Sequence, residues 1–464
     1  MVIRDEITPK ALLPATGEVF EAARAATHRL RERASELEGA PVFTVEGRYM
    51  PKGWTEWTQG FQFGNAVLLF DALGDESLLE YGRGETVRRM TPHLTHTGVH
   101  DHGFNNVSTY GNLLRLSYEG RTSKDEWERE FYRLALKVSG CVQAARWTPL
   151  PDGLGYVPSF NGAHSLFADT IRSMRSLAVA HRLGAELHGE QDARISLLTR
   201  LLQHSETTAR YNVYFGAGRD RWDIPGRVVH ESLFNVQSGS YRAPSSQQGY
   251  SPFTTWTRGH AWILCGFAEL LEFLETLDDS EFQEHGIDGL RSRTSVLERF
   301  REVATAVAEF YIEHTARDGI PYWDTGAPGL GQLGDWRAKP ADPWNTHEPV
   351  DSSAAAIGAQ GLLRLGRALR SKGDRYMGAG LTVCSTLFDD PYLSRDDGHE
   401  GILLHSLYHR PNRWDHEPDS DGVARGESCM WGDYHLLELA LYVSRLARDK
   451  PYLTFDPEMT DGTE

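Results

Sequence analysis

The segment Trp256-Thr-Arg-Gly-His-Ala-Trp262 stands directly before a run of apolar residues that recur at steps of three and four, the spacing of a helix. Glycine, aromatic and polar side chains crowd this segment. Five further helices are expected to begin near segments of the same kind: Trp54-Thr-Glu-Trp-Thr-Gln-Gly-Phe61, His100-Asp-His-Gly-Phe104, Ala168-Asp-Thr170, Asp351-Ser-Ser-Ala-Ala-Ala356 and Ser428-Cys-Met-Trp-Gly-Asp-Tyr434. Six helices with similar beginnings suggest one repeated structural role.

Helical periodicity extends over most of the chain, and the other helices, such as 124–146, are ordinary amphipathic ones with a charged face. Residues 123–126, from Ser123 to Glu126, have the pattern of a capping box at the start of a helix. Gly74 and Gly120 directly follow helical runs, at the position where helices often end in a left-handed residue. The helices predicted are 17–37, 54–73, 75–93, 104–119, 124–146, 164–184, 192–212, 254–276, 289–316, 352–371, 374–388 and 427–447.

Strand signals are sparse. Residues 42–45 look extended, the loops at 213–253 and 317–350 could hold small hairpins, and residues 1–15 are expected to be extended. If the six similar helices form an inner ring and the others an outer sleeve, crowding explains the small residues and a shared cavity explains the polar ones. This arrangement is an all-α (α/α)6 barrel of six helical hairpins. An α-solenoid would show a fixed repeat period, and the irregular motif spacing favours the closed ring.

Composition narrows the functional classes. The chain has 464 residues, 40% of them hydrophobic and 24% charged, and no Pro-, Ser- or Gly-rich linker divides it, so residues 1–464 are predicted to be one domain. A formal net charge of −17 argues against nucleic-acid or anionic-membrane partners. The N-terminus lacks the apolar stretch of a signal peptide, and the four cysteines form no CxxC pair, so a cytoplasmic protein with reduced thiols is expected.

Asp101 and Asp169 are the candidate working carboxylates, because each lies among apolar or aromatic residues rather than on a charged helix face. Burial raises the pKa of a carboxyl, and a second carboxylate nearby raises one of the pair further, which keeps a proton available near neutral pH. The alternative is that Asp169 pairs with Arg172 or Arg175 at helical spacing, and that Asp101 only caps the helix from Phe104.

Other motif residues suit a sugar ligand. Trp54, Trp57, Trp256 and Trp262 could stack on a sugar ring, although most of the twelve tryptophans are expected in the core. Arg258 and His260 are candidates for holding an anion, since arginine offers a planar fork to a carboxylate. The residues His230 and Gln248 lie in the long loop before this helix, where functional residues often occur.

No metal or other cofactor is predicted. His93, His96, His100 and His102 lie close together in sequence, but their spacing matches no familiar zinc pattern. The acidic stretch 415–427 also fails as a calcium loop, because the twelfth position counted from Glu417 is Ser428 rather than glutamate.

Taken together and in order, the motifs resemble those of the unsaturated glucuronyl hydrolases, glycoside hydrolase family 88, whose fold is the (α/α)6 barrel. The resemblance runs from about Trp54 to Tyr434. Its most telling elements are Trp57-Thr-Gln-Gly-Phe, His100-Asp-His-Gly-Phe, Ala168-Asp-Thr, Trp256-Thr-Arg-Gly-His-Ala-Trp, Pro349-Val-Asp-Ser-Ser-Ala-Ala-Ala and Trp431-Gly-Asp-Tyr.

The resemblance implies a hydrolase that hydrates the C4=C5 double bond of a terminal unsaturated uronic acid, which a polysaccharide lyase leaves behind, and releases the neighbouring sugar. It implies Asp169 as general acid and base and Asp101 as the second essential carboxylate. Arg425 and Ser428 lie in the stretch that borders the second sugar in the family, and Arg425 is expected to recognise a sulfate or a second carboxylate there. The alternative is that Arg425 is an ordinary solvated arginine on the surface. The other substrate-binding residues that the resemblance implies are Trp57, His100, His230, Gln248, Trp256, Arg258, Trp262 and His405.

The sequence departs from the family pattern at His102, at Asn105-Asn106 and at Ala168-Asp-Thr-Ile-Arg-Ser-Met174, which leaves the preference for the neighbouring sugar open. Three alternatives remain: an unsaturated rhamnogalacturonyl hydrolase, a sugar 2-epimerase-like (α/α)6 isomerase that works through histidine bases, and a glycan-binding protein without catalysis. The expected partner is an unsaturated uronyl oligosaccharide, and the protein is expected to be a monomer or a homodimer.

Overall fold

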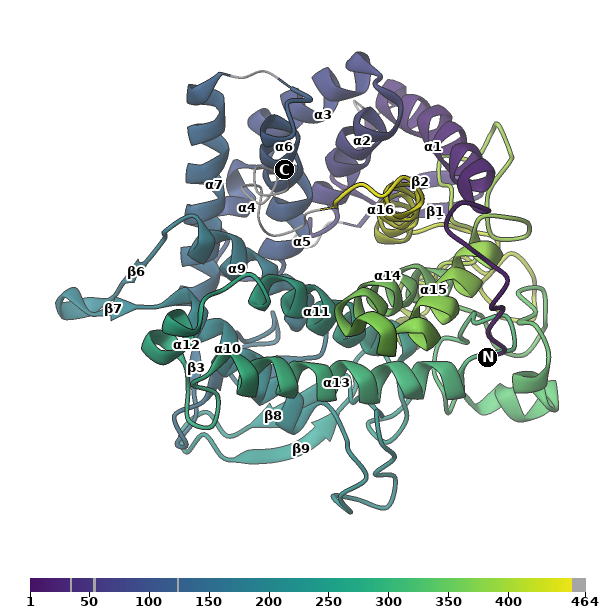
Figure 1. Cartoon of the computed structure of the whole chain (residues 1–464). Helices are drawn as coiled ribbons and strands as arrows, with labels where there is room; N and C mark the ends of the chain where they lie inside the picture. Colours follow the sequence, from purple (N-terminus) through teal and green to yellow (C-terminus); the bar gives the residue numbers. More distant parts are fainter. Residues whose placement is uncertain (34–35, 53–55, 123–124, 453–464) are drawn as a thin grey trace.

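Six helical segments pack side by side into a closed inner ring in this computed structural model, which describes residues 1–33, 36–52, 56–122 and 125–452 (Figure 1). Around the ring, α2 contacts α5, α5 contacts α8, α8 contacts α11, α11 contacts α14, α14 contacts α16, and α16 returns to α2. The segments are α2 (Gln59–Leu73); α5 (His102–Asn106) continued by the π-helical η2 (Val107–Gly111) and α6 (Asn112–Tyr118); α8 (Thr170–Ser173) continued by α9 (Arg175–Arg182); α11 (Thr257–Leu274); α14 (Ser352–Leu369); and α16 (Met430–Ala447).

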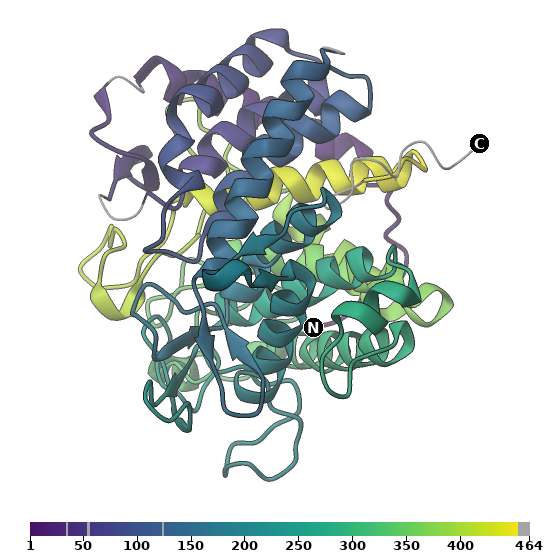
Figure 2. The ribbon, with the colours of Figure 1, turned by 90° about the vertical axis from the view of Figure 1, so that its left-hand side faces the viewer.

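Six further helices form the outer layer. They are α1 (Leu13–Arg33), α3 (Glu76–Arg89), α7 (Glu126–Ala145), α10 (Leu197–Tyr211), α13 (Arg293–His314) and α15 (Asp374–Leu387). α1 packs on α16 and α2, α3 on α2, α7 and α10 on α9, α13 on α11, and α15 on α14. Figure 2 shows α7 at the surface, in front of the ring. The predicted (α/α)6 barrel is therefore confirmed, with the expected division into inner and outer helices.

Glycine allows the inner helices to approach each other closely. A Cβ atom on Gly60 of α2 would lie 2.4 Å from the Cα of Asn105 in α5, and one on Gly103 of α5 would lie 2.4 Å from the carbonyl oxygen of Ser173 in α8. Real Cβ atoms do not approach other heavy atoms so closely, so larger residues would force the helices apart. The crowding predicted for the motif segments is thus a property of the ring contacts.

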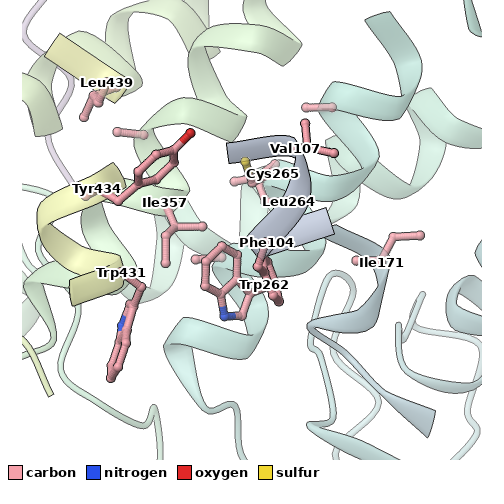
Figure 3. Close-up of a cluster of buried hydrophobic side chains, with 14 of the residues drawn as sticks. Phe104, Val107, Ile171, Trp262, Leu264, Cys265, Ile357, Trp431, Tyr434 and Leu439 are labelled. Carbon is pink, nitrogen blue, oxygen red and sulfur yellow. The ribbon is translucent and has the colours of Figure 1, made fainter. Parts of the chain in front are cut away.

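The ring interior is filled by buried side chains. Figure 3 shows part of this core, in which Phe104 of α5, Trp262 of α11, Ile357 of α14, and Trp431 and Tyr434 of α16 lie close together. Buried ion pairs complete it; the guanidinium of Arg172, for example, lies 2.8 Å from Glu269. No helix in the described ranges is long and apolar enough to span a bilayer.

The remaining elements are short. β1 (Pro41–Val45) pairs with β2 (Arg48–Pro51), β3 (Thr148–Pro149) with β4 (Gly155–Tyr156), and β6 (Leu187–His188) with β7 (Arg194–Ile195), all antiparallel. β5 (Ser165–Phe167), β8 (Glu231–Phe234) and β9 (Tyr241–Ser245) form an antiparallel three-stranded sheet in that order. The short helices α4 (Thr91–Leu94) and α12 (Asp279–His285) and several 3₁₀ turns lie in connections.

Several predicted boundaries were wrong. The helix predicted over 164–184 begins only at Thr170, because residues 165–167 form β5 and pair with β8. The helix predicted over 192–212 begins at Leu197, where Ser196 caps it. α1 begins at Leu13, so the extended N-terminal segment is shorter than residues 1–15.

Other local predictions had mixed outcomes. Ser123 of the predicted capping box lies outside the described residues, and the N-cap of α7 is Asp125, whose side chain accepts a hydrogen bond from the amide of Trp127. Gly74 has the expected left-handed conformation after α2. The loop at 213–253 contains the β8–β9 hairpin, whereas residues 317–350, all described, form 3₁₀ turns and no strand.

Candidate active site

The N-terminal ends of several inner helices converge on one pocket. Asp101, Asp169 and Trp256 occupy the N-cap positions of α5, α8 and α11, and Trp57 lies just before α2. All four line the pocket, which is partly open to solvent. The ring therefore brings together motif segments that are far apart in sequence.

His100 links the two candidate carboxylates. Its Nε2 atom lies 2.8 Å from Oδ2 of Asp169 and 3.8 Å from Oδ1 of Asp101. All three side chains are buried. Because this nitrogen hydrogen-bonds to Asp169 and lies near Asp101, the protonation of each of the three groups depends on the charge of the other two.

The pKa shifts of the two carboxyls have opposite directions. Burial raises the pKa of Asp101; the charge of His100 partly offsets this rise, and the charge of Asp169 adds to it. Burial alone would also raise the pKa of Asp169, but its hydrogen bond to His100 and the charges of His100 and His230 outweigh burial and place the pKa below its usual value. The raised pKa expected of a buried carboxyl thus holds for Asp101, while Asp169 is paired with His100.

The simpler explanations for the two aspartates do not hold. Arg172 and Arg175 are directed to Glu269, at 2.8 and 3.9 Å, rather than to Asp169. Asp101 occupies the N-cap position of α5, but its side chain makes no capping hydrogen bond. Neither carboxylate is therefore explained by helix capping or by a helical ion pair.

His230 adds a hydrogen-bond donor whose direction is fixed. Its Nδ1 atom accepts hydrogen bonds from the backbone amides of Gln247 and Gln248, at 3.0 and 3.3 Å, so the proton of the neutral ring is on Nε2. Burial lowers the pKa of His230 to about 4, which keeps the ring neutral near pH 7. Nε2 lies 3.9 Å from Oδ1 of Asp169, and both atoms are buried without a hydrogen bond to a described residue.

Arg258 holds the pocket wall together with all four of its terminal N–H bonds. Nη1 donates to Asp351, at 3.2 Å, and to the carbonyl of Leu407, and Nη2 donates to Oε1 of Gln248 and to the carbonyl of Tyr408, at 3.0 and 2.7 Å. The guanidinium also lies over the Trp256 and Trp431 rings, at 4.7 and 4.8 Å. Because Oε1 of Gln248 accepts from Arg258, the Gln248 amide group can direct its N–H bonds elsewhere.

Aromatic rings form another part of the lining. Trp57 stacks on Trp431 with ring centroids 4.8 Å apart, and Trp262 packs against Phe104 at 4.9 Å. Such apolar faces beside polar groups match the two-sided surface of a sugar ring. Trp54, the other tryptophan predicted in this region, lies outside the described residues.

The structure places the predicted residues in two groups. Trp57, His100, Asp101, Asp169, Gln248, Trp256, Arg258 and Trp262 line the pocket, and His230 adjoins Asp169. His405, Arg425 and Ser428 are not among its lining residues. The guanidinium of Arg425 is paired with Asp419 and Asp421, at 2.5 and 2.6 Å.

The predicted residues His405, Ser428 and His260 lie away from the pocket lining. The His405 ring packs edge-on against Trp344 at 4.6 Å, and Ser428 is fully buried beside Thr44. His260 packs against Phe310 and Tyr311 of α13, on the outer side of α11. His260 is thus not placed to hold an anion in this pocket.

Six lining residues were not predicted: Phe104, Phe160, Gln247, Tyr408, His409 and Trp414. Phe104 belongs to a quoted motif and Gln247 is next to a predicted residue, so proximity in sequence could have identified both. Trp414 stands alone in an acidic stretch of irregular structure, where no periodicity indicates which way a side chain points. Among the described residues, no group of three or more His, Cys, Asp or Glu side chains is arranged to hold a metal ion.

Comparisons with known proteins find relatives that cover most of the chain. No family model matches the chain. An unsaturated glucuronyl hydrolase from Bacillus sp. (strain GL1) is 26% identical over 418 residues, which cover 86% of this chain and 89% of the relative. A second one, from Formosa agariphila, is 23% identical over 385 residues, or 82% of this chain and 78% of the relative.

The fold comparison covers almost the whole chain. The crystal structure of the unsaturated glucuronyl hydrolase from Bacillus sp. GL1, described as responsible for the degradation of glycosaminoglycan, superposes with a TM-score of 0.67 at 22% identity over 93% of this chain and 96% of that one. That solved structure thus shares the barrel fold with this chain. Over most of its length the chain is similar to unsaturated glucuronyl hydrolases, the family that its motifs resemble.

Proposed function

We propose that this protein hydrates the C4=C5 double bond of a terminal unsaturated uronic acid on a lyase-generated oligosaccharide and thereby releases the neighbouring sugar. The observation that supports this most strongly is the pair of buried, unpartnered atoms Asp169 Oδ1 and His230 Nε2 in a pocket lined by indole rings. The names of the curated relatives point to the same substrate class.

In the proposed reaction Asp169 protonates C4 of the enol ether, and positive charge develops at C5 and the ring oxygen. Water then adds to C5 and returns its proton to the Asp169 carboxylate. The resulting hemiketal opens, the bond from C5 to the ring oxygen breaks, and the neighbouring sugar leaves from C1. One water molecule is consumed and the acid is regenerated, so one carboxyl can serve as both acid and base.

The hydrogen bond from His100 and the charges of His100 and His230 outweigh burial and lower the pKa of Asp169, so its carboxyl must gain a proton before it can act. A uronate carboxylate that enters the pocket brings a negative charge, which raises the pKa of nearby carboxyls. Asp101, with its raised pKa, can enter the cycle neutral and avoid adding a further negative charge. The substrate itself thus contributes to the protonation of Asp169.

In this proposal the uronate is bound by hydrogen-bond donors whose direction is fixed by the surrounding protein. The Nε2–H of His230 and the amide of Gln248, whose oxygen is held by Arg258, can donate to the sugar's oxygen atoms. The charge of Arg258 stabilises the uronate without a direct bond, because its terminal N–H bonds are already used. Trp57 and Trp262 would face the apolar sides of the ring.

Arg425 is proposed to recognise a sulfate or a second carboxylate on the neighbouring sugar. Its guanidinium is held by Asp419 and Asp421, and it also donates to the carbonyl of Asn345 at 2.9 Å. An incoming anion must compete with two carboxylates. We therefore expect Arg425 to adjust the preference among substrates rather than to decide whether the reaction occurs.

The ultraviolet absorbance of the unsaturated uronate tests the proposal, because hydration destroys it. Purified protein should bleach at least one unsaturated glucuronyl disaccharide and release its sugar in equal amount. Bleaching only of the unsaturated rhamnogalacturonan disaccharide would favour that alternative. If every disaccharide keeps its absorbance while glucosamine derivatives are epimerised or merely bound, hydration is not the function.

A further inference from the structure

The outer face of α7 carries a row of exposed apolar side chains. Trp127 is 80% exposed, Phe131 39% and Leu134 61%, and the half-buried Val138 continues the row. The steps of four, three and four residues put these side chains on one stripe of the helix. Figure 2, which faces this side of the molecule, shows α7 running across the surface in front of the other helices.

This stripe differs from ordinary scattered apolar exposure. Single exposed apolar residues are common on protein surfaces, but a contiguous row that includes a tryptophan and a phenylalanine is typical of contact surfaces. None of its four side chains lines the pocket. The side chains of the stripe therefore take no part in the proposed reaction, and their exposure indicates a different role.

Charged residues beside the stripe indicate which partner fits. In the seven-residue pattern of packed helices, Trp127 and Leu134 take the d positions and Phe131 and Val138 the a positions. Glu130 and Lys137 then take the two g positions on one edge. In an antiparallel pair of identical helices g positions face g positions, so Glu130 of each copy meets Lys137 of the other. In a parallel pair g positions face the e positions that follow, which are Ala135 and Val142, so these charges would have no opposite partner.

We propose that the protein forms a two-fold symmetric homodimer in which α7 of one copy packs antiparallel against α7 of a second copy. Trp127 packs near Val138 of the other copy, and Phe131 near Leu134. The interface is self-complementary, as a two-fold axis demands, and its two Glu130–Lys137 pairs are symmetry equivalents. Lys137 makes no ion pair with the described residues, so it is available for this contact.

The area of the proposed α7–α7 interface determines how tightly the dimer is expected to associate. α7 has 20 residues and so a length of about 30 Å. The β6–β7 hairpin projects outward beside the C-terminal half of α7 (Figure 1), so each hairpin can pass along the other copy and enlarge the contact. Stable interfaces bury about 800 Å² on each partner, and a smaller one of this kind is expected to dissociate at micromolar concentrations.

Sedimentation velocity on the full chain over a range of micromolar concentrations tests the dimer. The wild type should show a reversible monomer–dimer equilibrium. Leu134→Glu should weaken it by about tenfold or more, because a charge would be buried at the centre of the contact. Val236→Glu is the matched control: Val236 is 58% exposed in the turn between β8 and β9, and its change should leave the equilibrium unaltered.

A charge-reversal cycle tests the antiparallel register. Glu130→Lys and Lys137→Glu should each weaken the dimer, and the double variant should restore it. Glu130 is also 3.3 Å from Arg133 of its own helix, a contact that the double variant does not restore, so rescue of dimerisation reports on the contact between copies. Disaccharide bleaching and thermal unfolding of each variant verify that the pocket and the fold are intact.

A wild type that stays monomeric at every concentration overturns the proposal. So does a double variant no better than the single ones, or a dimer indifferent to Leu134→Glu. Sedimentation with anionic lipid vesicles provides a further arm: binding of the monomer through Trp127 would assign the stripe to a membrane surface instead, although the net charge of −17 opposes this.

Discussion

Oδ1 of Asp169 and Nε2 of His230 face each other at 3.9 Å, and neither atom has a hydrogen-bond partner among the described residues. The other oxygen of Asp169 is held by His100, and the other nitrogen of His230 by two backbone amides. The Asp169 carboxylate and the His230 ring are thus each held by hydrogen bonds on one side, and each directs its remaining polar atom at the other. An acceptor and a donor with this separation can hold one oxygen atom between them, which suits the attack of water on a sugar carbon.

His230→Ala should lower kcat by about 10²-fold, because the fixed donor beside Asp169 is lost, in the range measured for single preorganised donors. Steady-state bleaching of an unsaturated disaccharide measures this. His188→Ala serves as the control, since that histidine is exposed on the β6–β7 hairpin. Equal activity of the two variants would mean that His230 has no part in the reaction.

Asp101→Asn should change the pH profile of kcat/KM. Burial raises the pKa of Asp101, so in the wild type its ionisation places a second negative charge beside His100 as the pH rises. Activity should therefore be highest below that pKa and fall as the pH rises through it. The variant cannot ionise at this position, and it should show a lower rate with a shifted or absent descending limb.

An unchanged descending limb in Asp101→Asn would assign that ionisation to another group. Thermal unfolding at each pH separates loss of activity from loss of fold.

Arg258→Lys and Gln248→Ala should each lower kcat/KM, and their effects should not add. Lysine cannot supply the four donors that join Asp351, Gln248 and the carbonyls of residues 407 and 408. Since Arg258 acts partly by orienting Gln248, the double variant should be only slightly worse than the poorer single one, with a coupling of about 1 kcal/mol or more.

Arg375→Lys is the matched control for that cycle, because Arg375 pairs with Glu309 on the surface. Additive losses from Arg258→Lys and Gln248→Ala would show that the two side chains act independently.

Arg425→Ala should reduce turnover of a sulfated unsaturated disaccharide more than that of its unsulfated counterpart. The expected change in the ratio is several-fold at most, because Asp419 and Asp421 already neutralise this arginine. Arg413→Ala, an exposed arginine before Trp414, is the control. A ratio that is the same in wild type and Arg425→Ala would exclude the role.

The barrel could be predicted from the sequence because its determinants are local. Glycines such as Gly60 and Gly103 mark close contacts between helices, and the apolar period marks the helices themselves. The beginning of α8 could not be predicted, because the pairing of residues 165–167 with β8 depends on a segment more than 60 residues later in the chain.

The site was predictable to the extent that its residues lie at helix beginnings. Asp101 and Asp169 occupy N-cap positions, where side chains of the inner ring must meet. Periodicity does not extend to loop residues such as Trp414 and His409. Nor does the sequence show that Arg258 uses its N–H bonds on the protein, since its acceptors at 407 and 408 are backbone atoms about 150 residues away.

The stereochemistry of protonation at C4 tests the central proposal most directly. The reaction is run in deuterium oxide with an unsaturated disaccharide that the protein bleaches, and the product is reduced at once with borohydride so that C4 can no longer exchange. If Asp169 delivers the proton from its fixed position, the product carries deuterium on one face of C4 only, and Asp169→Asn loses about 10² to 10⁴ of the rate. Deuterium distributed equally over both faces, or an Asp169→Asn variant as fast as the wild type, would contradict it.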